Sequence, residues 1–245
     1  MDNHRIVSKE EWLISRKELL AKEKELTRMR DELSRARREL PWERVEKEYV
    51  FDSTSGKKTL SDLFDGRSQL IVYHFMFDPS WQEGCKSCSN LADSIDGAVL
   101  HLGARDTAFT MVSRAPLDKI DAFKKRMGWR FPWCSSNGSD FNYDFHVTLD
   151  PEKKDYEYNY AKAQTLLEAG KIWFPKGEMP GLSVFLRDGD TVYHTYSTYQ
   201  RGLDLPLNTY NFLDLTPLGR QEEGDRIQGW VRHHDRYGAS QAATP

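Results

Sequence analysis

A continuous run of apolar and aromatic residues in the first third of the chain places the strongest limit on its fold. Residues 70–77 read Leu-Ile-Val-Tyr-His-Phe-Met-Phe, without the alternation of a strand that has one face in water. Such a run is typical of a strand that is buried on both faces of a sheet covered by helices. Asp78 and Pro79 end it. The sequence therefore predicts an α/β protein with this strand at the centre of its sheet.

The segments that follow predict a mixed sheet. Residues 107–112 form a second strand candidate, and Pro116 opens a helical segment that Gly128 ends. A strand, a crossover helix and a second strand form a parallel pair. Residues 182–186 and 191–196 flank the turn Arg-Asp-Gly-Asp, so we expect them to form an antiparallel hairpin.

The same reading divides the chain into an N-terminal helical arm, residues 1–41, an α/β domain, residues 42–220, and a C-terminal tail, residues 221–245. Within the domain, residues 129–178 are rich in aromatic and turn residues, and we interpret them as an insertion with a short helix near residues 161–169.

The arm is predicted to be one long helix. Ser8 and Glu11 fit a capping box, and no Gly or Pro follows until Pro41. Apolar residues recur every seven positions along this stretch: Trp12, Leu19, Leu26, Leu33 and Leu40. This narrow stripe packs either against its own domain or against a second copy of the chain in a homodimer, and the pattern leaves both hypotheses open.

Composition excludes two classes of partner. The chain has 35 Lys and Arg against 38 Asp and Glu, a formal net charge of −3, so no basic field attracts it to nucleic acid. We find no apolar signal region near the N-terminus and no run of about 18 apolar residues, so no membrane partner is expected. The three cysteines cannot all pair within one molecule, which favours a reducing, cytoplasmic location.

Two of those cysteines carry the most specific chemistry of the chain. Cys85 and Cys88 form a Cys-x-x-Cys pair directly after the apolar strand and at the head of a helical segment. A sulfur at a helix N-terminus is stabilised as thiolate by unpaired amides, and Lys86 adds a cation beside it. Cys85 is therefore the predicted nucleophile, and Cys88, one turn further, is the predicted resolving thiol of a disulfide exchange that needs no cofactor.

Metal binding is the alternative for the same pair. Structural zinc would need a second closely spaced pair of ligands, which the solitary Cys134 and the adjacent His233 and His234 do not supply. A mononuclear copper site made of Cys85, Cys88 and a histidine such as His194 stays open, because thiolate and imidazole suit copper.

The order of these elements is that of thioredoxins, and long stretches resemble a bacterial and fungal family of thioredoxin-like proteins that are described as dithiol-disulfide oxidoreductases or isomerases. The resemblance covers nearly the whole chain, and its matching stretches are residues 18–41, 69–77, 84–89, 101–106, 112–116, 126–129, 141–145 and 193–202. It implies a thioredoxin-like, three-layer α/β/α fold with a mixed sheet. It also implies a protein or a small molecule with a disulfide or thiol as substrate.

Pro180 resembles the cis-proline that faces the dithiol in thioredoxins, although a trans proline that merely starts a strand is the alternative. A cis bond would expose the backbone of Met179 for pairing with a substrate chain. We therefore predict a site of Cys85, Cys88 and Pro180.

Three residues are predicted to bind the substrate: Trp81, Lys86 and Met179.

The resemblance also has departures. Gly84 stands where thioredoxins usually carry an aromatic residue, and Gln82 stands where the peroxiredoxin pattern requires Thr, three positions before the reactive cysteine. A peroxidase-like protein and a non-catalytic dimeric interaction protein remain alternative functions.

Overall fold

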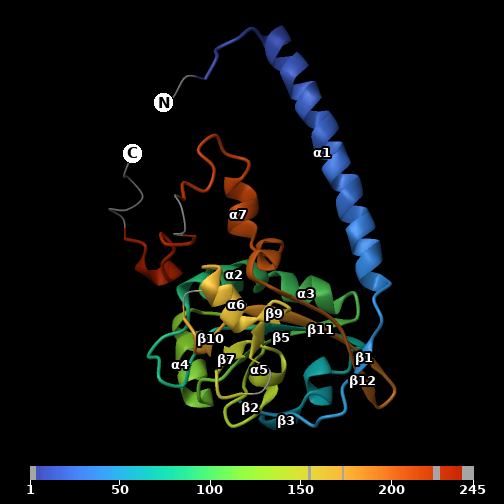
Figure 1. Cartoon of the computed structure of the whole chain (residues 1–245), viewed down its shortest axis with the longest axis vertical. Helices are drawn as coiled ribbons and strands as arrows, with labels where there is room; N and C mark the ends of the chain where they lie inside the picture. The colour runs from blue at the N-terminus through green and yellow to red at the C-terminus, as the bar shows by residue number, and fades with distance from the viewer. Residues whose placement is uncertain (1–3, 154–155, 173, 223–226, 239–245) are drawn as a thin grey trace. The chain divides into compact units, whose positions relative to one another are not determined.

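The computed structural model describes residues 4–153, 156–172, 174–222 and 227–238, and the chain divides into two compact units, Met1–Pro41 and Trp42–Pro245 (Figure 1). The described part of the tail belongs to the second unit. None of the helices within these ranges is long and apolar enough to cross a membrane.

The first unit consists of the helix α1, Lys9–Arg38. Its start is the predicted capping box: the Ser8 hydroxyl accepts from the Glu11 amide, and the Glu11 carboxylate accepts from the Ser8 amide. In the apolar stripe Leu19, Leu26 and Leu33 are 52%, 54% and 52% exposed. Pairing of this stripe with a second copy of the chain stays a prediction.

The second unit is built on an eight-stranded mixed sheet in the order β1-β12-β11-β4-β5-β6-β2-β3. The predicted central strand is β4, Gln69–His74, which pairs in parallel with β5, Thr107–Ser113, and antiparallel with β11, Gly181–Asp188. The predicted hairpin is formed by β11 and β12, Thr191–Tyr199. The remaining strands are β1 Glu43–Arg44, β2 Val50–Ser53, β3 Gly56–Thr59 and β6 Trp133–Ser135.

Helices cover both faces of the sheet because β4 presents apolar side chains to each. On one face Tyr73 packs in a core with α2, Lys86–Ile95, α4, Leu117–Arg126, and α7, Asn208–Leu213. On the other face Val72 packs with η1 Ser61–Phe64 and α5 Phe141–Asp144. The short helix α3, Ala98–Gly103, follows α2, and η2 Gln200–Asp204 follows β12. This is the predicted thioredoxin-like α/β/α arrangement.

The aromatic segment 129–178 is more than an appendage, because it supplies β6 to the sheet and α5 to the core. It also forms a third apolar cluster with Met179 and Tyr199. Its other elements are short: β7 Thr148–Leu149, β8 Glu157–Tyr158, β9 Ala161–Lys162, α6 Ala163–Glu168 and β10 Gly177–Glu178. The tail ends in η3, His234–Arg236.

Candidate active site

The dithiol lies at the start of α2, the element that follows the central strand β4 along the chain. Cys85 is the N-cap residue of this helix, and its amide donates to the Met76 carbonyl oxygen at 3.0 Å. Its side chain is partly exposed, whereas that of Cys88 is 1% exposed. All three cysteines are thiols rather than disulfides. The predicted pair is therefore positioned as one accessible and one buried sulfur.

The two sulfurs differ in acidity for reasons that the local geometry supplies. The Cys88 thiol donates to Cys85, and together with the backbone amides of Cys88 and Ser87 it lowers the pKa of Cys85 to about 7, although burial opposes this shift. Burial, followed by the hydrogen bond to Cys85, raises the pKa of Cys88 well above its usual range. Near neutral pH the structure thus favours a thiolate on Cys85 and a thiol on Cys88.

Tyr73 is a site residue that the sequence reasoning missed. It lies on β4, is 2% exposed, and its hydroxyl donates to the sulfur of Cys88. Burial raises the pKa of Tyr73 well above its usual range, so the hydroxyl keeps its proton. The sequence feature that could have indicated it is the Tyr73 hydroxyl within the largely apolar run 70–77, because a buried Tyr hydroxyl needs a hydrogen-bond partner.

A pocket of about 450 Å³ opens onto the dithiol. Both cysteines line it, and so do Met179 and Pro180, two of the residues that the sequence analysis assigned to the site. Its other walls come from elements far apart in the sequence and include Tyr73, Met76, Leu91, Tyr158, Leu203 and Leu207. The thioredoxin-like order of elements therefore does bring Pro180 to the dithiol.

The bond before Pro180 is trans, so of the two alternatives the cis bond suggested by the resemblance is not the one found. Every peptide bond in the described part of the chain is trans. The Met179 amide donates to the Val147 carbonyl oxygen at 2.8 Å, and the Pro180 carbonyl oxygen accepts from the Tyr158 hydroxyl at 2.9 Å. Both partners belong to the aromatic insertion. Met179 is consequently 7% exposed, and its N–H is already used within the fold.

The other two predicted substrate contacts lie outside this pocket. Trp81 is partly buried against the core, and its carbonyl oxygen accepts from the Lys119 ammonium group at 3.0 Å. The Lys86 ammonium group donates to the Gly229 carbonyl oxygen in the tail at 3.1 Å. Neither residue lines the hollow in front of the dithiol.

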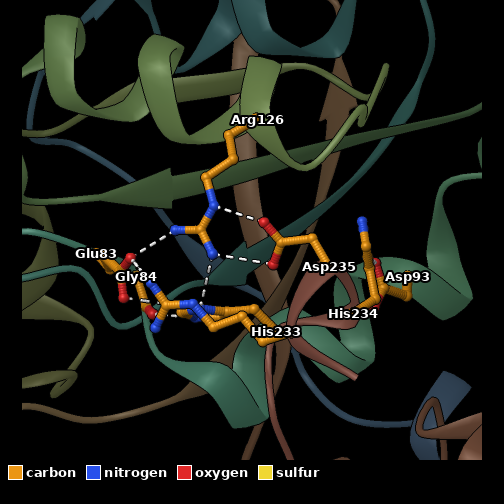
Figure 2. Close-up of polar contacts among 8 residues, drawn as sticks. Glu83, Gly84, Asp93, Arg126, His233, His234 and Asp235 are labelled. Atoms are coloured by element: carbon orange, nitrogen blue, oxygen red, sulfur yellow. Dashed lines mark hydrogen bonds and ion pairs between the residues drawn. The ribbon is translucent and has the colours of Figure 1, made fainter. Parts of the chain in front are cut away.

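The C-terminal tail reaches the residues just before the dithiol, which the sequence did not reveal (Figure 2). The Arg126 guanidinium makes two hydrogen bonds to Asp235, at 2.7 and 2.9 Å, and one to Glu83 at 2.6 Å. The Nε2 atom of His233 is 2.9 Å from the Gly84 carbonyl oxygen. Because a carbonyl can only accept, Nε2 carries the proton and donates. The tail thus holds the backbone that precedes Cys85.

His194, the third ligand of the copper hypothesis, lies on β12 and lines a different hollow. Its Nε2 atom is 2.7 Å from the Ser197 hydroxyl, and its ring packs edge-on against Phe145. Among the residues that the structure describes, no group of three or more His, Cys, Asp or Glu side chains is placed to hold a metal ion. The proposed ligand set of Cys85, Cys88 and His194 is therefore not assembled.

Cys134, the third cysteine, is 3% exposed on β6. Burial raises the pKa of its thiol, which disfavours the reactive thiolate.

A buried carboxylate lies one residue before Met179. Glu178 is 1% exposed and accepts from Arg114 at 2.9 Å and from the Thr148 hydroxyl at 3.0 Å. Burial raises the pKa of Glu178 to about 7, against the opposing effect of Arg114.

This pKa predicts a pH-dependent stability. The carboxyl of Glu178 has a pKa near 4.5 in the unfolded chain and about 7 in the folded protein, so between these pH values the folded protein keeps a proton that the unfolded chain releases. The stabilisation that this proton gives is complete below pH 4.5 and is lost as the pH rises to about 7. We expect Glu178→Gln to reduce the fall in unfolding free energy between pH 5 and pH 7.5 by on the order of 2 kcal/mol. Urea titrations at the two pH values measure it, with the exposed Glu152→Gln as control. Equal falls in the wild type and Glu178→Gln would contradict the prediction.

Comparison with solved structures gives two examples to which this chain is similar over about two thirds of its length. A variant of PrxQ from Xylella fastidiosa is 17% identical with a TM-score of 0.42, and the match covers 67% of this chain and 88% of that one. Peroxidoxin BcpB from Mycobacterium tuberculosis is 13% identical with a TM-score of 0.45, and the match covers 69% and 95% of the two chains. No curated protein matches the chain.

A family model covers almost the whole sequence, from the helical arm through the dithiol to the tail segment that holds it. The model is described as "Bacterial protein of unknown function (DUF899)", and it matches residues 1–237. The chain belongs to this DUF899 family, and within it has a thioredoxin-like fold with a Cys-x-x-Cys pair at the start of α2.

Proposed function

We propose that the protein is a thiol-disulfide oxidoreductase in which Cys85 is the nucleophile and Cys88 the resolving thiol. One observation carries the proposal: a partly exposed sulfur at a helix start accepts hydrogen bonds from a second thiol and two amides, which lower its pKa to about 7. An attacking thiol with a pKa near the ambient pH combines a substantial thiolate fraction with high nucleophilicity.

The exchange proceeds in two balanced steps. The Cys85 thiolate attacks one sulfur of the substrate disulfide, the substrate S–S bond breaks, and the first half leaves as a thiolate that takes up a proton. Cys88 then loses its proton to solvent and attacks the Cys85 sulfur, which releases the second half as a thiolate. The substrate gains two electrons, and the protein ends with a Cys85–Cys88 disulfide. An electron donor must reduce this disulfide before another turnover.

Alkylation tests the proposal directly. We expect iodoacetamide to label Cys85 before Cys88 and Cys134, with a rate that rises with pH around a midpoint near 7. Peptide mapping after timed labelling identifies the modified cysteine, and the urea-unfolded protein serves as control with a midpoint near 9. Equal labelling of all three cysteines in the folded protein would overturn the proposal.

Tyr73 should act on the second step rather than on the first. Its hydroxyl donates to Cys88, so it stabilises the thiolate that forms there during resolution. We expect Tyr73→Phe to slow resolution by roughly tenfold, since a hydrogen bond to a charged group contributes about 1.5 kcal/mol or more. Stopped-flow measurement of mixed-disulfide decay gives this rate.

The control for Tyr73→Phe is Tyr49→Phe, which removes a hydroxyl that donates to Asp144 on the other face of the sheet. Iodoacetamide labelling of Cys85 should change little in either variant. Unchanged resolution in Tyr73→Phe would show that the hydroxyl does not assist Cys88.

A further inference from the structure

We infer that the substrate is a low-molecular-weight disulfide with an apolar or aromatic body, rather than a disulfide in a folded protein. This inference rests on the proposed function and names the substrate class of the same dithiol. It depends on the shape of the hollow, on the chemistry of its walls and on the backbone groups beside it.

The hollow has the size and lining of a small-molecule site. Its volume of about 450 Å³ falls within the usual range of roughly 300–1,000 Å³ for such pockets. Apolar side chains surround the sulfurs: Met76, Leu91, Met179, Leu203 and Leu207. An apolar group next to a reacting disulfide would be removed from water on binding, which favours its association.

Polar side chains accompany this apolar wall. Lys171, Gln200, Arg201 and Gln228 line the same hollow, and the Arg201 guanidinium also lies 2.6 Å from the Asp204 carboxylate. Lys171 and Arg201 are exposed, so they meet the solvent at the opening. A substrate with an apolar body and a polar end matches this distribution.

Two backbone groups beside the dithiol that a polypeptide could pair with are already used within the fold. Docking of an extended chain requires unused N–H and C=O groups at a strand edge. The Met179 amide donates to Val147, and the Pro180 carbonyl oxygen accepts from Tyr158. Gly181 begins β11, which has β4 on one side and β12 on the other. The Met179 N–H is therefore not free to pair with the backbone of a protein substrate.

The reaction of such a substrate is balanced within one turnover. The reduced protein and one disulfide R–S–S–R′ yield the Cys85–Cys88 disulfide and the two thiols RSH and R′SH. Two electrons pass from the dithiol to the substrate, so no further reductant is needed when reduced protein is used in excess.

Three probes separate the substrate classes: benzyl 2-hydroxyethyl disulfide, bis(2-hydroxyethyl) disulfide and insulin. The two small disulfides share a reacting alkyl S–S bond and differ in the aromatic group. Each second-order rate constant is divided by that of dithiothreitol with the same probe, which removes differences in intrinsic reactivity. We expect the normalised rate for the benzyl probe to exceed those for the other two by at least tenfold.

Two further measurements test whether the hollow causes this preference. Met76→Gln places an amide in the wall at nearly constant volume, and Leu205→Gln changes a leucine that is 53% exposed and lies outside the hollow. We expect the first variant to lose most of the preference and the second to keep it. In the wild type, benzyl methyl sulfide, which has no disulfide, should slow iodoacetamide labelling of Cys85 by occupying the hollow.

The outcomes distinguish this inference from the proposed function. Equal normalised rates for the two small probes, or a faster reaction with insulin, would overturn the substrate class while leaving the oxidoreductase in place. Failure of Cys85 to react with any of the three disulfides would overturn the proposed function itself. Retention of the benzyl preference in Met76→Gln, together with no protection by benzyl methyl sulfide, would also contradict the assignment to this hollow.

Discussion

Replacement of Cys85 by serine should abolish disulfide reduction, whereas the same change at Cys134 should leave it intact. Serine has no thiolate near neutral pH, so the first bond to the substrate cannot form. Cys134 is buried on β6 and has a raised pKa, which makes it a matched control for the loss of a thiol. Spectrophotometric release of thiol from the benzyl probe, with reduced protein in excess, measures the loss.

Cys88→Ser completes this series. Cys85 retains its position at the helix start, so the first step should still occur, but the mixed disulfide should persist because no resolving thiol follows. Intact-protein mass spectrometry then detects an adduct of one substrate half on Cys85. Undiminished disulfide reduction in Cys85→Ser, or an adduct on Cys134 instead, would contradict the assigned roles.

The second large effect is expected at Gly84. A Cβ atom at this position would lie 2.6 Å from Cε1 of Phe75 and 2.8 Å from Cε1 of Phe123, both in buried rings. Real Cβ atoms do not approach other atoms so closely, so Gly84→Ala must displace the rings or the chain that leads into Cys85. We expect a loss of about 3 kcal/mol in unfolding free energy, at the upper end for overpacking.

Urea unfolding measures the effect at Gly84, and Gly97→Ala provides the control. Gly97 has helical dihedral angles between α2 and α3, and a Cβ there meets no atom within 4 Å. Alanine at that position should be neutral or slightly stabilising, because it restricts the unfolded chain. If Gly84→Ala lowers the unfolding free energy no more than Gly97→Ala does, the rings of Phe75 and Phe123 can move aside with little loss of stability.

The close packing explains the departure from thioredoxins before the first cysteine. An aromatic residue in place of Gly84 would enter the space that Phe75 and Phe123 already fill. Both rings belong to the core that packs around Tyr73 and Cys88. His233 then fixes the carbonyl group of Gly84 from the tail.

The sequence by itself determined the elements whose signals are local. The apolar run gave the central strand β4, the tight turn gave the hairpin of β11 and β12, and the capping box gave the start of α1. The dithiol geometry is local too, because Cys85 and Cys88 lie one helical turn apart at the head of α2. Each of these depends on residues that are near one another in the chain.

Only the tertiary structure decided what surrounds the two sulfurs. The trans bond at Pro180 is held by partners in the aromatic insertion, and the hydrogen bond from His233 to Gly84 joins residues 149 positions apart. The hydrogen bond from the Tyr73 hydroxyl to Cys88 depends on the packing of α2 on β4. No periodicity encodes such contacts, since they arise when separate elements fold onto one sheet. The sequence thus determined where the two reactive cysteines lie. The packing of distant segments decided the pKa values of their thiols, the residues that line the pocket and how accessible each sulfur is.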